Sequence, residues 1–162
     1  MKAGSVQGGR DWKTKPSDRF VLKWIKLYLS SKVTPILARF RWITPLMITC
    51  TSTTLGVAGG ILLGLGYGWQ GGILAAVGQL FDGVDGQLAR LTSRESHLGG
   101  FLDSVLDRYS DGFLVVGLTV FALRIPSPLP PVLVGLIGTL AFISCNSVSY
   151  SAARAANLGF DL

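Results

Sequence analysis

Four aspartates stand in two closely spaced pairs near the middle of the chain. Asp82 and Asp85 are three residues apart, and Asp103 and Asp107 are four residues apart. On a helix, both spacings place the two carboxylates of a pair on the same face. Because the two segments are joined by a short loop, their helices should be antiparallel neighbours. We therefore expect the four carboxylates to converge from two facing helices.

Such a cluster predicts a metal site that handles a phosphorylated ligand. Four carboxylates repel one another, and Arg90 and Arg108 cannot neutralise all of them. Carboxylate oxygens suit Mg²⁺, Mn²⁺ or Ca²⁺, and Mg²⁺ commonly shares its ligands with substrate phosphates. Gly83 and Gly86 leave the helix face bare for a bulky ligand. Arg90 adds a fork of hydrogen-bond donors for a phosphate.

Two other interpretations of the acids are open. They are either ordinary acids at helix ends beside arginines that reach toward water, or a polar proton or ion pathway in a transporter. Four acids, two glycines and one arginine at these offsets favour the metal site. Arg94 and His97, in the connecting loop, are interpreted as solvated loop residues rather than ligands.

The elements that carry these residues have the composition of membrane helices. The chain is 49% hydrophobic and only 15% charged, whereas a soluble domain is typically about 25% charged. A helix needs about 20 apolar residues to cross a bilayer. We therefore predict an all-α integral membrane protein with at least four transmembrane helices. Their expected ranges are Leu46–Gly66, Trp69–Arg90, Gly99–Leu123 and Pro131–Ala153.

The N-terminal part is basic and differs from the rest. Ten of the fifteen Lys and Arg residues precede residue 42, and six of the nine acids lie between residues 82 and 111. We expect residues 1–17 to be flexible and residues 18–42 to form an amphipathic segment in the membrane interface, with Arg19, Lys23, Lys26 and Ser30 on its polar stripe. Residues 43–162 would form the transmembrane domain. An arm of this kind fits a membrane surface better than a nucleic acid.

The distribution of basic residues also predicts an orientation. The N-terminal arm, the loop at residues 91–98 and the C-terminal end carry the positive charge and should all face the cytoplasm. The protein would then be a multi-pass protein of the cell membrane, and its acidic site would face the cytoplasm. Gly56, Gly60 and Gly64 repeat every four residues and indicate a close helix contact, within one subunit or between two.

The acidic motif resembles the signature of the CDP-alcohol phosphatidyltransferase family. The resemblance covers residues 43–159 and implies a fold of usually six membrane helices. Either two helices are missing after the fourth, or the protein is a shortened relative. It also implies an enzyme of phospholipid biosynthesis, which transfers a substituted phosphate from a CDP-linked donor such as CDP-diacylglycerol to an alcohol and releases CMP. The matching positions are Asp82-x2-Asp85-Gly86-x2-Ala89-Arg90-x8-Gly99-x3-Asp103-x3-Asp107.

The same resemblance implies roles for individual residues. Two Mg²⁺ or Mn²⁺ ions would be held by the four acids of the motif, Asp82, Asp85, Asp103 and Asp107. Asp107 would also be the general base. The pocket for the cytidine diphosphate would be lined by Gly86, Ala89 and Arg90, with Thr49 from the first membrane helix.

The acceptor is expected to be an alcohol such as inositol phosphate or glycerol phosphate. Arg154 resembles an arginine that contacts the acceptor phosphate in the inositol-phosphate-using branch, and this branch is the best match. An arginine that reaches from the helix end toward water is the other interpretation of Arg154. The family also implies a homodimer.

Two other functions are open from the sequence. Membrane prenyltransferases also pair aspartate motifs around a metal-bound diphosphate, but they lack the glycine between the acids and the arginine. A partial or inactive chain would bind the CDP compound without turnover and would act as a binding or assembly partner.

Overall fold

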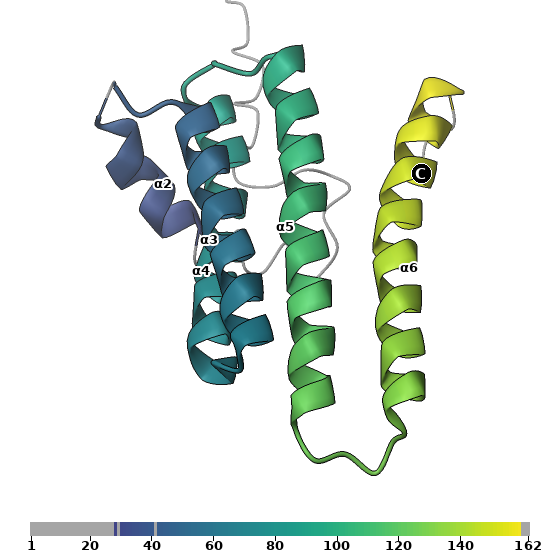
Figure 1. Ribbon diagram of the computed structural model, residues 1–162. Coiled ribbons are helices and arrows are strands. Elements are labelled where there is room, and N and C mark those ends of the chain that lie inside the picture. The colour runs from purple at the N-terminus through teal and green to yellow at the C-terminus, as the bar shows by residue number, and fades with distance from the viewer. Residues whose placement is uncertain (1–27, 29, 41, 160–162) are drawn as a thin grey trace, which may run out of the picture.

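The computed structural model describes residues 28, 30–40 and 42–159, and every regular element in these ranges is helical (Figure 1). The predicted all-α class is confirmed for this part of the chain. Each of the four expected membrane segments is one helix, with ends within a few residues of the prediction. The helices are α2 (Ser31–Ala38), α3 (Pro45–Leu65), α4 (Gly68–Leu91), α5 (His97–Arg124) and α6 (Pro131–Asn157).

The helices form an up-and-down bundle in which α3, α4 and α5 lie together and α6 stands beside α5 (Figure 1). By length and composition, two helices among the described residues can cross a membrane, over Pro45–Leu65 and Pro131–Ala155. The helices α4 and α5 carry the aspartates of the motif, which lowers their apolar character. The count of four spans therefore stays a prediction.

Local sequence signals determine where the central helices begin and end. Thr44 caps α3, because its side chain accepts a hydrogen bond from the Met47 N–H at 3.3 Å, and Pro45 occupies the first turn, where no N–H is needed. Gly66 ends α3 in the left-handed conformation, at φ 98°. Ser96 caps α5 by accepting from the Gly99 N–H at 3.0 Å. This cap fixes the first turn of the helix that carries the second pair of aspartates.

Glycines allow α3 to approach both of its neighbours closely. A Cβ added to Gly60 would collide with the Phe113 carbonyl of α5, and a Cβ added to Gly117 would collide with the Gly60 carbonyl. A Cβ on Gly59 would lie 2.9 Å from the Gly71 carbonyl oxygen of α4. The glycine repeat of α3 therefore marks a contact within one subunit.

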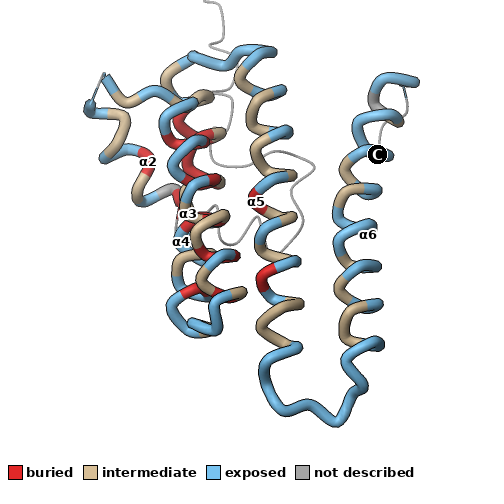
Figure 2. Tube along the Cα trace, in the orientation of Figure 1, coloured by how far each residue is buried: buried red, intermediate tan, exposed pale blue. Residues whose placement is uncertain are grey.

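Most buried residues lie along the contact between α3 and α4, and a few more lie on α2 and α5 (Figure 2). Ile48, Val84 and Leu88 form a small core, and Val33 and Leu37 of α2 pack against it. No described side chain of α6 is buried. The helix α2 falls within the predicted interfacial segment 18–42. The basic residues of the predicted stripe lie outside the described residues, so the segment boundaries stay predictions. The placement of Ser30 on that stripe is wrong, because Ser30 is fully buried and its hydroxyl donates to the Leu80 carbonyl of α4 at 3.2 Å.

Candidate metal centre

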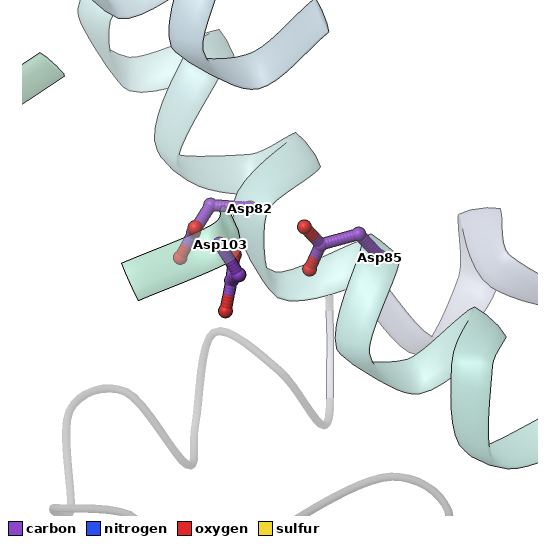
Figure 3. Close-up of side chains that lie close together, drawn as sticks. All are labelled: Asp82, Asp85 and Asp103. Carbon is purple, nitrogen blue, oxygen red and sulfur yellow. The ribbon is translucent and has the colours of Figure 1, made fainter. Parts of the chain in front are cut away.

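Three of the four predicted metal ligands meet at one point of the bundle. Asp82, Asp85 and Asp103 each place one carboxylate oxygen within 4.8 Å of the corresponding oxygens of the other two. Asp82 and Asp85 come from successive turns of α4, and Asp103 reaches them from α5 (Figure 3). Asp85 is only 5% exposed, and the other two are half-buried. Three hard oxygen donors at this spacing fit a divalent cation.

Asp107 lies one turn further along α5 and outside this group of three. Its side chain comes within hydrogen-bonding range of Asp82 and lies close to Asp103 and Asp111. The negative charges of α4 and α5 therefore extend along the helix contact for more than one turn. So many carboxylates require a positive counter-charge. The structure thus brings all four acids into one region, while their individual roles stay predictions.

The carboxylate of Asp85 is held on both oxygens. Its Oδ2 accepts a hydrogen bond from the Thr49 hydroxyl at 2.5 Å, and its Oδ1 accepts from the Gly86 N–H at 2.5 Å. Thr49 is itself buried and belongs to α3. Three helices therefore build the cluster. The contact between Thr49 and Asp85 is not part of the prediction from sequence, which places Thr49 beside the nucleotide.

A cavity of about 400 Å³ opens beside the aspartates, a size within the usual range of roughly 300–1,000 Å³ for small-molecule sites. All four residues predicted to bind the donor line it, together with Asp85 and Asp103. The first residues of α3 and the loop before α5 complete its walls. The lining includes Thr44, Pro45, Leu46, Thr49, Asp85, Gly86, Ala89, Arg90, Arg94, Glu95, Ser96, Gly99, Gly100 and Asp103.

Opposite charges face the same cavity. Arg90 lies over Gly86, since a Cβ built on Gly86 would be 3.5 Å from Arg90 Nη1. Arg94 is exposed in the loop before α5, as expected of a solvated residue, and it also lines the cavity. Two guanidinium groups and the carboxylates of Asp85 and Asp103 therefore share one cavity. This arrangement suits a diphosphate that contacts arginines and metal ions together.

Arg108 points away from this cavity and joins α5 to α6. Its Nη2 pairs with Asp111 at 3.2 Å, and its Nη1 donates to the Cys145 carbonyl at 3.3 Å and to the Ser149 hydroxyl. Arg154 is exposed near the end of α6 and does not line the 400 Å³ cavity. The end of α6 lies at the same end of the bundle as the loop between α4 and α5 (Figure 1). The acceptor role of Arg154 stays a prediction.

A sequence model of the family described as CDP-alcohol phosphatidyltransferase matches residues 42–159. This match covers most of the chain and includes every residue of the cluster and the cavity. The chain belongs to this family. CDP-alcohol phosphatidyltransferases are membrane proteins and are generally dependent on a divalent metal, for which the three-aspartate group offers ligands. The assignment leaves the prenyltransferase interpretation without support.

Individual members of the family resemble the chain over most of its length. The archaetidylinositol phosphate synthase of Methanothermobacter thermautotrophicus is 36% identical over 74% of this chain and 53% of that protein. The bifunctional IPC transferase and DIPP synthase of Thermococcus kodakarensis is 33% identical over 85% of this chain and 30% of that protein. The chain therefore spans about half or less of the length of these two curated relatives.

A solved structure of the family shares the fold. The phosphatidylinositol phosphate synthase of Mycobacterium tuberculosis, crystallised with CDP-DAG bound, aligns with a TM-score of 0.68 and 29% sequence identity. The alignment covers 81% of this chain and 64% of that chain. The helical arrangement that brings the aspartates together is thus one found in an experimental structure of a CDP-alcohol phosphatidyltransferase.

Proposed function

We propose that the protein transfers a substituted phosphate from a CDP-linked lipid to inositol phosphate and releases CMP. The observation that carries this proposal is the group of Asp82, Asp85 and Asp103 beside a cavity that also contains Arg90. The donor is supported by the CDP-DAG in the related crystal structure. The acceptor is supported by the names of relatives that make inositol phosphate lipids.

Different residues of the site would bind the metal ions and the phosphates of the donor. Asp82, Asp85 and Asp103, with Asp107 beside them, would hold Mg²⁺ or Mn²⁺, as two ions. When bound, such ions neutralise the diphosphate and stabilise the leaving CMP. Arg90 donates hydrogen bonds to the phosphates. Gly86 has no side chain, so the ligand can approach the backbone of α4.

Asp107 is the proposed general base. It takes the proton from the acceptor hydroxyl. The acceptor oxygen then forms a bond to the phosphorus that carries the lipid, and the bond from that phosphorus to the CMP oxygen breaks. Asp107 suits this role because it lies at the border of the three-aspartate group rather than within it.

The acceptor side and the membrane arrangement complete the proposal. Arg154 binds the acceptor phosphate through a charge-assisted hydrogen bond. The four long helices cross the cell membrane with the aspartates toward the cytoplasm, and two copies form a homodimer. Arg154 lies in the last turn of α6, and this end of α6 is at the same end of the bundle as the loop after α4 (Figure 1), which supports an acceptor site near the aspartates.

The function is tested by measuring CMP release from CDP-diacylglycerol by the whole chain in detergent. Release should require Mg²⁺ or Mn²⁺ and inositol phosphate, and chelation should abolish both release and donor binding. Glycerol phosphate in place of inositol phosphate should give little CMP. Donor binding with no CMP from any acceptor would instead support the inactive partner, and metal-independent binding of equal strength would refute the metal centre.

Three matched Asp→Asn variants of α5 test the assigned roles. Asp103→Asn should weaken metal and donor binding together. Asp107→Asn should lower kcat by roughly 10²–10⁴-fold, the usual contribution of a general base, and should weaken donor binding much less than Asp103→Asn does. Asp111→Asn is the control, because the Asp111 carboxylate pairs with Arg108. If Asp111→Asn loses turnover and Asp107→Asn does not, the base is Asp111.

A further inference from the structure

The face of α4 that points away from the aspartates carries a buried polar contact. The Thr34 hydroxyl of α2 lies 2.7 Å from Gln87 Oε1 and 2.9 Å from the Ser30 carbonyl, and its one proton is shared between these two acceptors, of which Gln87 is the nearer. Thr34 and Gln87 are both 0% exposed. Gln87 stands inside the aspartate motif, but helical periodicity turns it to the other side of α4 from Asp82 and Asp85. The contact therefore links α2 to the motif helix from behind the site.

A second polar contact and an apolar layer support the same joint. The Ser30 hydroxyl, also fully buried, donates to the Leu80 carbonyl of α4 at 3.2 Å. Val33 and Leu37 of α2 pack against the small core that includes Val84. Because buried polar groups are expensive to leave without a partner, two such bonds define one position of α2 on α4.

The chain that leaves α2 leads directly to the wall of the cavity. Phe40 N–H donates to the Leu37 carbonyl and Ile43 N–H to the Phe40 carbonyl, both at 3.0 Å. These turns deliver the chain to Thr44 and Pro45, which line the cavity together with Gly86, Ala89 and Arg90 of α4. One wall of the cavity is therefore formed by α4, and another is formed by Thr44 and Pro45, which follow α2 in the chain. The contact between Thr34 and Gln87 joins the two walls outside the cavity.

We propose that Thr34 and Gln87 are positioning residues that set the spacing between these two walls of the donor pocket. A hydrogen bond holds its two atoms 2.7 Å apart here, whereas apolar carbons rest about 3.5–4.0 Å apart. Loss of the bond should therefore widen the joint by about 1 Å, and a displacement of a pocket wall by this amount should weaken donor binding. The inference rests on the proposed function, because the pocket is taken as the site of the CDP-linked donor.

Two substitutions of one residue separate the hydrogen bond from the packing. Thr34→Val keeps the shape and removes the hydroxyl, and Thr34→Ser keeps the hydroxyl. With CDP-diacylglycerol and Mn²⁺, Thr34→Val should raise the donor Kd and KM roughly tenfold, with kcat and the acceptor KM unchanged. Thr34→Ser should stay close to wild type. Thr119→Val is the matched control, because the Thr119 hydroxyl donates within α5 to the Val115 carbonyl at 2.7 Å, away from the pocket.

A double variant distinguishes positioning from stability. In Thr34→Val with Gln87→Leu both polar partners are replaced, and such replacements are often nearly neutral for folding. We expect the double variant to regain the wild-type Tm while the donor KM stays raised. If the donor KM recovers together with the Tm, or if Thr34→Val binds the donor normally, the proposal is wrong. If wild-type protein binds no CDP-linked donor, the proposed function fails, and the positioning role fails with it.

Discussion

Removal of the Thr49 hydroxyl should weaken the metal centre without disturbing the fold. Thr49→Val preserves the shape of the side chain but deletes the 2.5 Å hydrogen bond to Asp85 Oδ2. A hydrogen bond to a charged group contributes about 1.5–3 kcal/mol, and about 1.4 kcal/mol is a factor of ten. The expected loss of metal affinity is therefore roughly 10- to 100-fold, which agrees with the usual effect of removing a partner of a metal ligand.

Calorimetric titration of Mn²⁺, with and without CDP-diacylglycerol, measures this loss. Thr53→Val is the matched control: Thr53 is one turn along α3, is 9% exposed, and donates to the Thr49 carbonyl at 2.9 Å rather than to an aspartate. Thr53→Val should bind Mn²⁺ within about twofold of wild type, because it removes no ligand partner. If Thr49→Val and Thr53→Val bind Mn²⁺ with equal affinity, Thr49 does not orient Asp85 for metal binding. Weaker donor binding with unchanged Mn²⁺ affinity would instead place Thr49 on the nucleotide.

The remaining predictions concern the other walls of the site and the membrane. Gly86→Ala should leave the Tm unchanged or slightly higher, since alanine favours a helix. The new Cβ enters the cavity 3.5 Å from Arg90 Nη1 and should raise the donor KM roughly tenfold. An unchanged donor KM would show that the ligand does not approach this face of α4. Arg154→Ala should raise the KM for inositol phosphate only, and equal loss for both substrates would contradict an acceptor role. In a chain whose own cysteines are replaced by serine, cysteines at Ser93 and Ser127 should label from opposite sides of sealed vesicles, with labelling from the same side refuting the orientation.

The helices and the meeting of the aspartates could be predicted because both depend on local sequence. Long, mainly apolar runs specify the four long helices, and residues such as Pro45 and Gly66 mark the ends. The spacing of Asp82 and Asp85 fixes a helix face, and the short loop brings α5 alongside. These relations require only the helical period and the length of a connection.

Contacts between distant segments could not be predicted in the same way. Thr49 is 36 residues from Asp85, and Thr34 is 53 residues from Gln87. Each pair depends on the rotation of one helix and its height against another, which periodicity leaves undetermined. Arg94 was missed for a related reason: a charged loop residue looks solvated until the cavity beside it is known. Its place in the short link between two acidic helices was the only available signal.

The glycines of α3 connect the packing of the bundle to the chemistry of the site. Gly60 meets the Phe113 carbonyl of α5 with no room for a side chain, and Gly59 approaches α4 at Gly71 in the same way. Since α3 contacts both helices backbone to backbone, α4 and α5 are held close to a common neighbour. Carboxylate side chains are short, so Asp103 can come within 4.8 Å of the α4 acids only if the two helices are close. The spacing of the predicted metal ligands therefore depends on small residues of α3, α4 and α5 that lie several turns from the aspartates.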